Sequence, residues 1–503
     1  MDQDAPAGRA ERPDVNPPGT DGHAPPNGGI VTEGLEAMRP PVSTPVTPET
    51  PPKGRVDLTQ GHLLRGIVML SWPIVSGAVL NWIMGVADIK MVGRLGPHAI
   101  AAVGQSMSII FTVQFVVFAI ATGTQVLVAR YTGARRPDRV TEVTRQSIIL
   151  ALVAGLPMIP VGLLVSRTLL IWMGAQGEVL EQSVIYTHAM FWGSVGMMLN
   201  FLLASSLQGA GDSLTPLWML IWINVAHIAI EYCLIFGVGP FPAMGVAGAG
   251  WAVVISRGAA ALVMLWIVGS GRYAVKVPWR GPWRVDWSTW GKMFYIGTPS
   301  SVQGLVRSVG YAVLIAILNR TTAGELAVAG HVTAGQWSSL GIFAGLAMMT
   351  AAMTAVGQNM GAKNPARAER SCWSVVAIST VASGALALLC IVFARPLVGF
   401  FTDDPTAYYW GHWALIYIAI SLPPATISMA FSGGLRGAGD TMSPLWATVV
   451  GTVIVGPGLG WLLALHLNMG PVGVWIGMVA SMVVQAIHTG LIFKAGRWKK
   501  IEL

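Results

Sequence analysis

Two stretches of this chain repeat each other. Residues 207–218 read LQGAGDSLTPLW and residues 435–446 read LRGAGDTMSPLW, so eight of the twelve positions are identical. The second stretch follows the first by 228 residues (446 − 218). The same spacing relates TGARRPDR at residues 132–139 to MGAKNPAR at residues 360–367. A duplication of nearly half the chain predicts a protein built from two structural repeats.

The composition indicates a membrane protein. The 503 residues are 53% hydrophobic and only 11% charged, with a mean hydropathy of +0.60. Soluble globular proteins carry about 25% charged residues. Apolar runs recur that are long enough to cross a ~30 Å hydrocarbon core as helices, whereas a β-barrel would show alternating segments of about 10 residues. We therefore expect an all-α polytopic membrane protein.

Twelve apolar segments give the expected spans. They cover residues 63–91, 99–129, 142–165, 180–206, 215–236, 246–269, 290–318, 326–356, 369–394, 406–432, 443–465 and 472–494. We expect a disordered Pro- and Gly-rich tail at residues 1–60, a six-helix lobe at 61–271, a cytoplasmic linker at 272–289 and a second six-helix lobe at 290–503. The GAGD stretches, each followed by Pro, are typical of turns between helices.

The net charge of +8 comes largely from loops. Lys and Arg cluster before the first span, in every second loop after it and in the C-terminal tail, which is the distribution of cytoplasmic segments. We therefore expect no nucleic-acid partner, a location in the plasma (inner) membrane and both termini in the cytoplasm. Six spans per half make the two repeats parallel.

The chain resembles the multidrug and toxic compound extrusion (MATE) transporters. The matching stretches are VADIKMVGRLGPHAIAAVG at 86–104, GVAGAGWAVVIS at 245–256, TAVGQNMGAKNPARAER at 354–370 and the two GAGD loops. The resemblance implies two lobes arranged as a V around a central cavity. It also implies export of organic, often cationic, compounds driven by inward H⁺ or Na⁺. We further expect a monomer in the lipid bilayer, with no enzyme activity, cofactor or resident metal.

An antiporter needs an ionisable group inside the membrane that binds the coupling ion in one state and releases it in another. Asp88 lies in the stretch that resembles the family's first-helix motif, and Glu231 lies between two apolar runs. The resemblance places polar coupling residues at the positions of Glu231 and His227, which share one helix face at i and i+4. We predict Asp88, Glu231 and His227 as the cation-coupling site, with H⁺ favoured over Na⁺. The alternatives are a solvated Asp88 and a structural polar contact between helices.

The second half departs from another branch of the family. That branch has a Glu and an Asp where this chain has Arg307 and Ala425, which argues against a Na⁺ site in the second lobe. Arg307 is a candidate for an anionic substrate group or for a structural salt bridge, and Arg257 carries the same ambiguity. Other polar side chains are candidates for the cavity wall or for interhelical hydrogen bonds. The full set of predicted cavity residues is Asn81, Asn200, Asn224, Gln303, Arg307 and His331.

Two other functions compete with an antiporter. A lipid-linked oligosaccharide flippase of the same superfamily stays open because of Arg257 and Arg307, although its members usually have more spans. A membrane-embedded enzyme is the alternative of another class, but no HExxH, GxSxG or Walker motif supports it.

Overall fold

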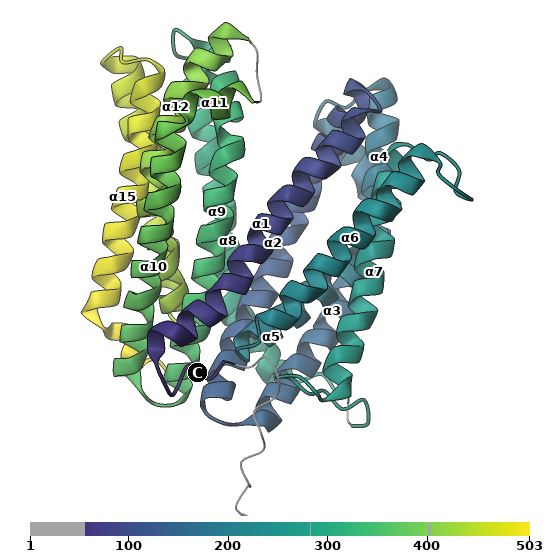
Figure 1. The fold of residues 1–503 in the computed structure, drawn as a ribbon, viewed down its shortest axis with the longest axis vertical. Helices are drawn as coiled ribbons and strands as arrows, with labels where there is room; N and C mark the ends of the chain where they lie inside the picture. Colours follow the sequence, from purple (N-terminus) through teal and green to yellow (C-terminus); the bar gives the residue numbers. More distant parts are fainter. Residues whose placement is uncertain (1–55, 282, 401–403, 503) are drawn as a thin grey trace, which may run out of the picture. The chain divides into compact units, whose positions relative to one another are not determined.

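The computed structural model describes residues 56–281, 283–400 and 404–502 (Figure 1). The predicted tail lies outside the described residues as far as residue 55. Residues 56–60 belong to the folded part, because the Leu58 side chain is 1% exposed and its N–H donates to Gln358 Oε1 at 3.3 Å. All regular secondary structure in the described residues is helical.

Helices of the first repeat form one bundle. They are α1 (Leu63–Gly93), α2 (Pro97–Gly133), α3 (Pro137–Trp172), α4 (Gly177–Trp192), α5 (Ser194–Gly209), α6 (Leu214–Phe236) and α7 (Val246–Ser270). The second repeat supplies α8 (Trp287–Asn319), α9 (Gly324–Gly361), α10 (Pro365–Val392), α11 (Ala394–Gly399), α12 (Pro405–Gly437), α13 (Met442–Thr448), α14 (Gly456–Trp461) and α15 (Pro471–Ala495). The π-helical segment Val449–Val455 joins α13 to α14, and a second one, Leu462–His466, continues α14, so that Met442–His466 forms one long helical segment.

Eleven helices in the described residues are long and apolar enough to cross a membrane, and α4 with α5 makes a twelfth span if the pair is counted as one. The span expected over residues 180–206 is divided into these two helices. The pair bends by 50° around Gly193. Beyond the bend, Gly196 approaches the backbone of Gly258 so closely that an added Cβ would lie 3.2 Å from the Gly258 Cα. Two glycines thus let α5 pack directly against α7.

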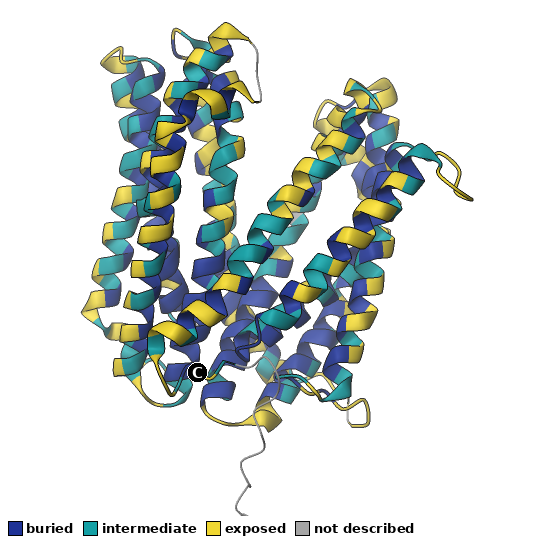
Figure 2. Ribbon diagram, viewed as in Figure 1, coloured by how far each residue is buried: buried dark blue, intermediate teal, exposed yellow. Residues whose placement is uncertain are grey.

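Three long helices are the most buried. In α9, α12 and the second part of α2, between 61% and 67% of the apolar window is buried, against 22–39% in the other unbroken spans. Figure 2 shows the same contrast, with exposed residues along the outer helix faces. These central helices bring the repeats together, because α2 packs against both α8 and α9.

The C-terminal ends of α2 and α9 meet through glycines. A Cβ added at Gly133 would overlap the backbone of Gln358, and a Cβ added at Gly361 would overlap the backbone of Arg130. Hydrogen bonds surround this contact: Gln125 Nε2 donates to Thr354 Oγ1 at 3.0 Å. Small residues therefore allow the two repeats to touch backbone to backbone.

Both GAGD stretches form the predicted turns. Gly211 and Gly439 have φ values of +91° and +94°, a region that favours glycine. Asp212 accepts from the backbone N–H of Thr215 at 3.0 Å and from its hydroxyl at 2.7 Å. Asp440 makes the same two bonds with Ser443, at 3.0 and 2.7 Å. Burial raises the pKa of Asp212, against the opposing effect of the Thr215 hydrogen bonds.

Candidate functional site

Three ionisable side chains of the first bundle meet between α1 and α6. His227 Nε2 lies 3.6 Å from Asp88 Oδ1 and 3.5 Å from Glu231 Oε2. The Glu231 side chain is 2% exposed, that of His227 7% and that of Asp88 35%. The predicted coupling residues are therefore neighbours, and Asp88 is the least buried of the three.

The hydrogen bonds of α7 fix the orientation of the imidazole. Ser256 Oγ lies 2.7 Å from the carbonyl of Ala252 and 3.1 Å from His227 Nδ1. A hydroxyl has one hydrogen, and the carbonyl takes it, so Ser256 accepts from an Nδ1–H. A neutral His227 then turns the lone pair of Nε2 toward the two carboxyl groups. This assignment follows from the hydrogen-bond network.

The carboxyl oxygens that face Nε2 are otherwise unsatisfied. Asp88 Oδ1 and Glu231 Oε2 are buried and have no hydrogen-bond partner. Three acceptors meeting in a buried place need at least one hydrogen between them, because an unpaired buried polar atom is costly. A proton on Nε2 or on one carboxyl oxygen meets this need.

Polar groups around the cluster come from α5, α6 and α7. Asn224 lies one turn before His227, and its Nδ2 is buried without a partner. Asn200 Nδ2 donates to the carbonyl oxygens of Gly196 at 2.9 Å and Arg257 at 2.6 Å. Arg257 is half-buried and interacts electrostatically with Asp88. The side-chain amide of Asn200 thus joins α5 to α7 through backbone hydrogen bonds.

The other predicted cavity residues do not join this cluster. Asn81 is exposed on α1. Gln303 and Arg307 lie on α8, and His331 is buried on α9 with its ring 6.0 Å from that of Tyr311. The structure therefore separates the predicted residues into an acidic group in the first bundle and a group in the second bundle that has no acidic member.

Sequence reasoning missed Arg436. This residue is 3% exposed on α12, where its Nη2 donates to Gln303 Oε1 and its Nη1 lies 3.4 Å from the sulfur of Met349. The repeat contained a signal for it, because Arg436 stands where the first copy has Gln208. A charge at only one of two equivalent positions is a difference between the lobes.

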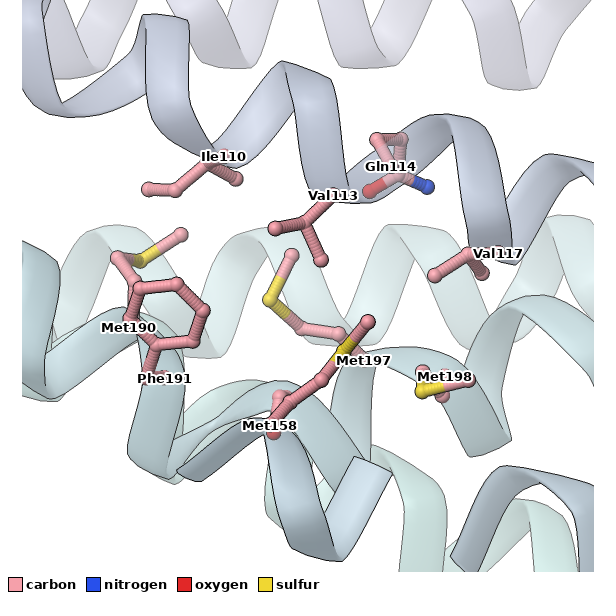
Figure 3. A pocket seen from close by; sticks show the side chains of 10 residues that line it. Ile110, Val113, Gln114, Val117, Met158, Met190, Phe191, Met197 and Met198 are labelled. Atoms are coloured by element: carbon pink, nitrogen blue, oxygen red, sulfur yellow. The ribbon is translucent and has the colours of Figure 1, made fainter. Parts of the chain in front are cut away.

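A small cavity lies inside the first bundle, between α2, α3, α4 and α5 (Figure 3). Methionines dominate its wall, together with Ile110, Val113 and Phe191. Its volume of about 30 Å³ has room for about one water molecule, whereas drug-sized ligands need some 300–1,000 Å³. Here methionine fills gaps in a core and does not line a drug site.

The acidic cluster is also compact enough for a cation. The ligand atoms of Asp88, His227 and Glu231 all lie within 4.8 Å of one another. Na⁺ is a hard cation that prefers several oxygen ligands, and the cluster offers carboxyl oxygens from two residues beside a ring nitrogen. The donor set suits a proton better than Na⁺.

Comparison with known proteins places this architecture. A model of the MatE family matches residues 73–233 and 299–462, one match in each repeat. A probable multidrug resistance protein NorM of Thermotoga maritima is 27% identical over 442 residues, covering 87% of this chain and 94% of that protein. The multidrug resistance protein MdtK of Photorhabdus laumondii is 24% identical and covers 86% and 95% of the two chains.

Solved structures agree with the sequence relatives. One is described as the outward-facing conformation of a multidrug resistance MATE family transporter of the MOP superfamily, and it matches with a TM-score of 0.83 at 25% identity. The match covers 89% of this chain and 98% of the other. The structure of a MATE P26A mutant matches with a TM-score of 0.82, also at 25% identity, over 88% and 98% of the two chains. The chain therefore belongs to the MatE family, and it is a multi-pass membrane transporter of the MATE type.

Proposed function

We propose that this protein is a secondary antiporter that exports drug-like organic cations in exchange for protons. The relatives described as multidrug resistance proteins support the class of substrate. The observation that supports proton coupling is the cluster of Asp88, His227 and Glu231, in which the buried acceptor atoms outnumber the hydrogens available to them.

The coupling follows from competition for one negative site. Two carboxyl groups in a buried place repel each other when both are charged, and a bound proton relieves that repulsion. An organic cation near Asp88 relieves it in the same way. Proton and substrate therefore exclude each other, and such negative coupling between two ligands is the thermodynamic basis of antiport.

The direction of transport depends on orientation. We propose that the protein lies in the plasma membrane as a monomer with both termini in the cytoplasm, because its basic loops then lie inside. In that orientation the glycine contact of α2 and α9 lies on the cytoplasmic side and separates the acidic cluster from the cytoplasm. Protons then enter the cluster from outside, and the cation leaves toward the outside.

Inverted membrane vesicles test the proposal. Ethidium uptake is followed by fluorescence under an imposed H⁺ gradient, and separately under a Na⁺ gradient. We expect the H⁺ gradient alone to drive uptake. Asp88→Asn and Glu231→Gln should each abolish it, since each removes one ionisable partner. His227→Asn should reduce it, because an amide still offers an acceptor.

Glu325→Gln is the matched control, because it changes an exposed carboxylate in the first turn of α9. It should transport like the wild type. Normal uptake in both Asp88→Asn and Glu231→Gln, at unchanged expression, would exclude this cluster as the coupling site. Uptake driven by the Na⁺ gradient alone would show that the coupling ion is Na⁺ and not H⁺.

A further inference from the structure

The second bundle contains two guanidinium groups that face no acid. Gln303 and Arg307 lie four residues apart on α8 and share one helix face. Gln303 Oε1 accepts from Arg436 Nη2, and Gln303 Nε2 donates to the carbonyl of Pro444 at 3.1 Å. Arg307 is near enough to Arg436 to repel it. Gln303 thus holds Arg436 beside Arg307.

Neither arginine has a counter-ion. No ion pair among the described residues includes Arg307 or Arg436, and no acidic side chain acts electrostatically on either one. Two described carboxylates of this bundle bond to other residues, and Glu325 is exposed in the first turn of α9. Asp440 bonds to Ser443, and Glu369 pairs with Lys499.

Their hydrogen bonding is incomplete as well. Arg436 meets only a neutral amide oxygen and a thioether, and its Nε is buried without a partner. Arg307 forms no hydrogen bond with any described residue and is half-buried in the middle of α8. A cation at this depth of a membrane protein is costly and normally finds a partner or a function. Two adjacent cations without a partner are costlier still.

We propose that Arg307 and Arg436 bind the carboxylate of a transported compound, with Arg307 as the direct contact and Arg436 as the charge behind it. A guanidinium matches a carboxylate with two parallel hydrogen bonds, and the second charge strengthens the attraction. The site rests on the proposed transport function for its ligand. It extends the substrate class from cations to compounds that also carry a carboxylate.

A matched pair of dyes tests this site. Rhodamine 19 has a free carboxyl group, and rhodamine 6G is its ethyl ester with the same cationic ring system. Binding of each dye to the purified full-length protein is measured by fluorescence anisotropy without any ion gradient. We expect the wild type to bind rhodamine 19 about ten- to a hundredfold more tightly than rhodamine 6G, the range for hydrogen bonds to a charged group.

The variants separate this site from general damage. Arg307→Gln should abolish the preference while leaving rhodamine 6G affinity within about twofold, because the ester never used the guanidinium. Arg307→Lys should keep part of the preference, since it keeps the charge but loses the planar fork. Arg320→Gln, at the exposed end of the same helix, should behave like the wild type.

Equal affinity of the wild type for the two dyes would overturn the proposal, as would an unchanged preference in Arg307→Gln. Absence of saturable rhodamine 19 binding would overturn it too. Because no gradient is present, these results are independent of proton coupling. Loss of gradient-driven ethidium uptake with an intact dye preference would leave this site standing and count against the proposed antiport.

Discussion

Replacing Gly361 by alanine is expected to separate the two repeats at the ends of α2 and α9. The added Cβ would overlap the carbonyl oxygen of Arg130, which is backbone and cannot rotate away. Gly361 has helical backbone angles, so alanine brings no strain of its own. The helices must therefore move apart, by about 1.5 Å if normal contact distance is to be restored.

A movement of that size breaks the hydrogen bonds that join the repeats. Gln125 donates to the carbonyl of Thr350 at 3.2 Å and to Thr354 Oγ1 at 3.0 Å. Thr354 Oγ1 donates to the carbonyl of Gln208 at 3.2 Å, and Gln358 Nε2 donates to that of Gly209 at 3.1 Å. Bonds lengthened past 3.6 Å are lost. At about 0.5–1 kcal/mol each, four bonds stabilise the closed contact by about 2–4 kcal/mol, a shift of roughly 30- to 700-fold in the equilibrium.

Spin labels report this change. Cysteines at Asp138 and Ala366, both exposed, carry the labels in a background where the three natural cysteines are alanine. Pulsed electron paramagnetic resonance then measures the distance between the repeats. We expect a longer distance in Gly361→Ala and no change in Gly335→Ala, a control on the same helix whose added Cβ meets nothing within 4 Å. Identical distance distributions in the two variants would refute the reasoning.

Three further predictions concern the turn, the topology and the tail. Asp440→Ala should lower stability in detergent by about 1 kcal/mol through loss of the hydrogen bonds from Ser443 at the start of α13, and Asp440→Asn should restore most of it; equal thermal unfolding of both variants would contradict this. Cysteines placed at Arg135 and Lys363 should resist a membrane-impermeant maleimide in intact cells and react after lysis, because these basic loops are expected inside. Deleting residues 2–55 should leave ethidium efflux unchanged, since the segment lacks the apolar content of a core; lost efflux at normal expression would reveal a role for it.

Much of the fold follows from the sequence, because membrane-spanning helices can be recognised from the length of their apolar segments. The repeated GAGD stretches predicted turns, and Gly211, Gly439 and the two aspartates form them. The bend at Gly193 was not predicted, because isolated glycines are common in membrane helices and do not by themselves indicate a break. The position of Leu58 was not predicted either, because its backbone N–H donates to Gln358, which lies 300 residues away in the sequence.

The candidate site was partly predictable for similar reasons. His227 and Glu231 share a helix face, so their proximity follows from helical spacing alone. The approach of Asp88 from α1 came only from resemblance, and the bond to Ser256 on α7 came from neither. The missing counter-ion of Arg307 could not be predicted, because it depends on the side chains of all the helices that pack around this residue. A local sequence pattern gives no information about them.

The contact between α2 and α9 has the symmetry of a homodimer. Gly133 meets the backbone of Gln358, and Gly361 meets that of Arg130, and both pairs of equivalents are 228 residues apart (361 − 133 and 358 − 130). Ala129 and Gly357 are also equivalents, and an added Cβ on Gly357 would lie 2.8 Å from the Ala129 Cβ, which places the pair on the axis. Such a self-complementary contact is what two copies of one ancestral six-helix protein would share.

Fusion of the two gene copies would have removed the constraint that symmetry places on a homodimer. In a symmetric dimer every substitution occurs twice, so an acid gained on one side is gained on the other. In a fused chain each half mutates alone. The two halves of this chain differ in this way, because the first holds the buried cluster of Asp88 and Glu231, and the second has Arg436 where the first has Gln208.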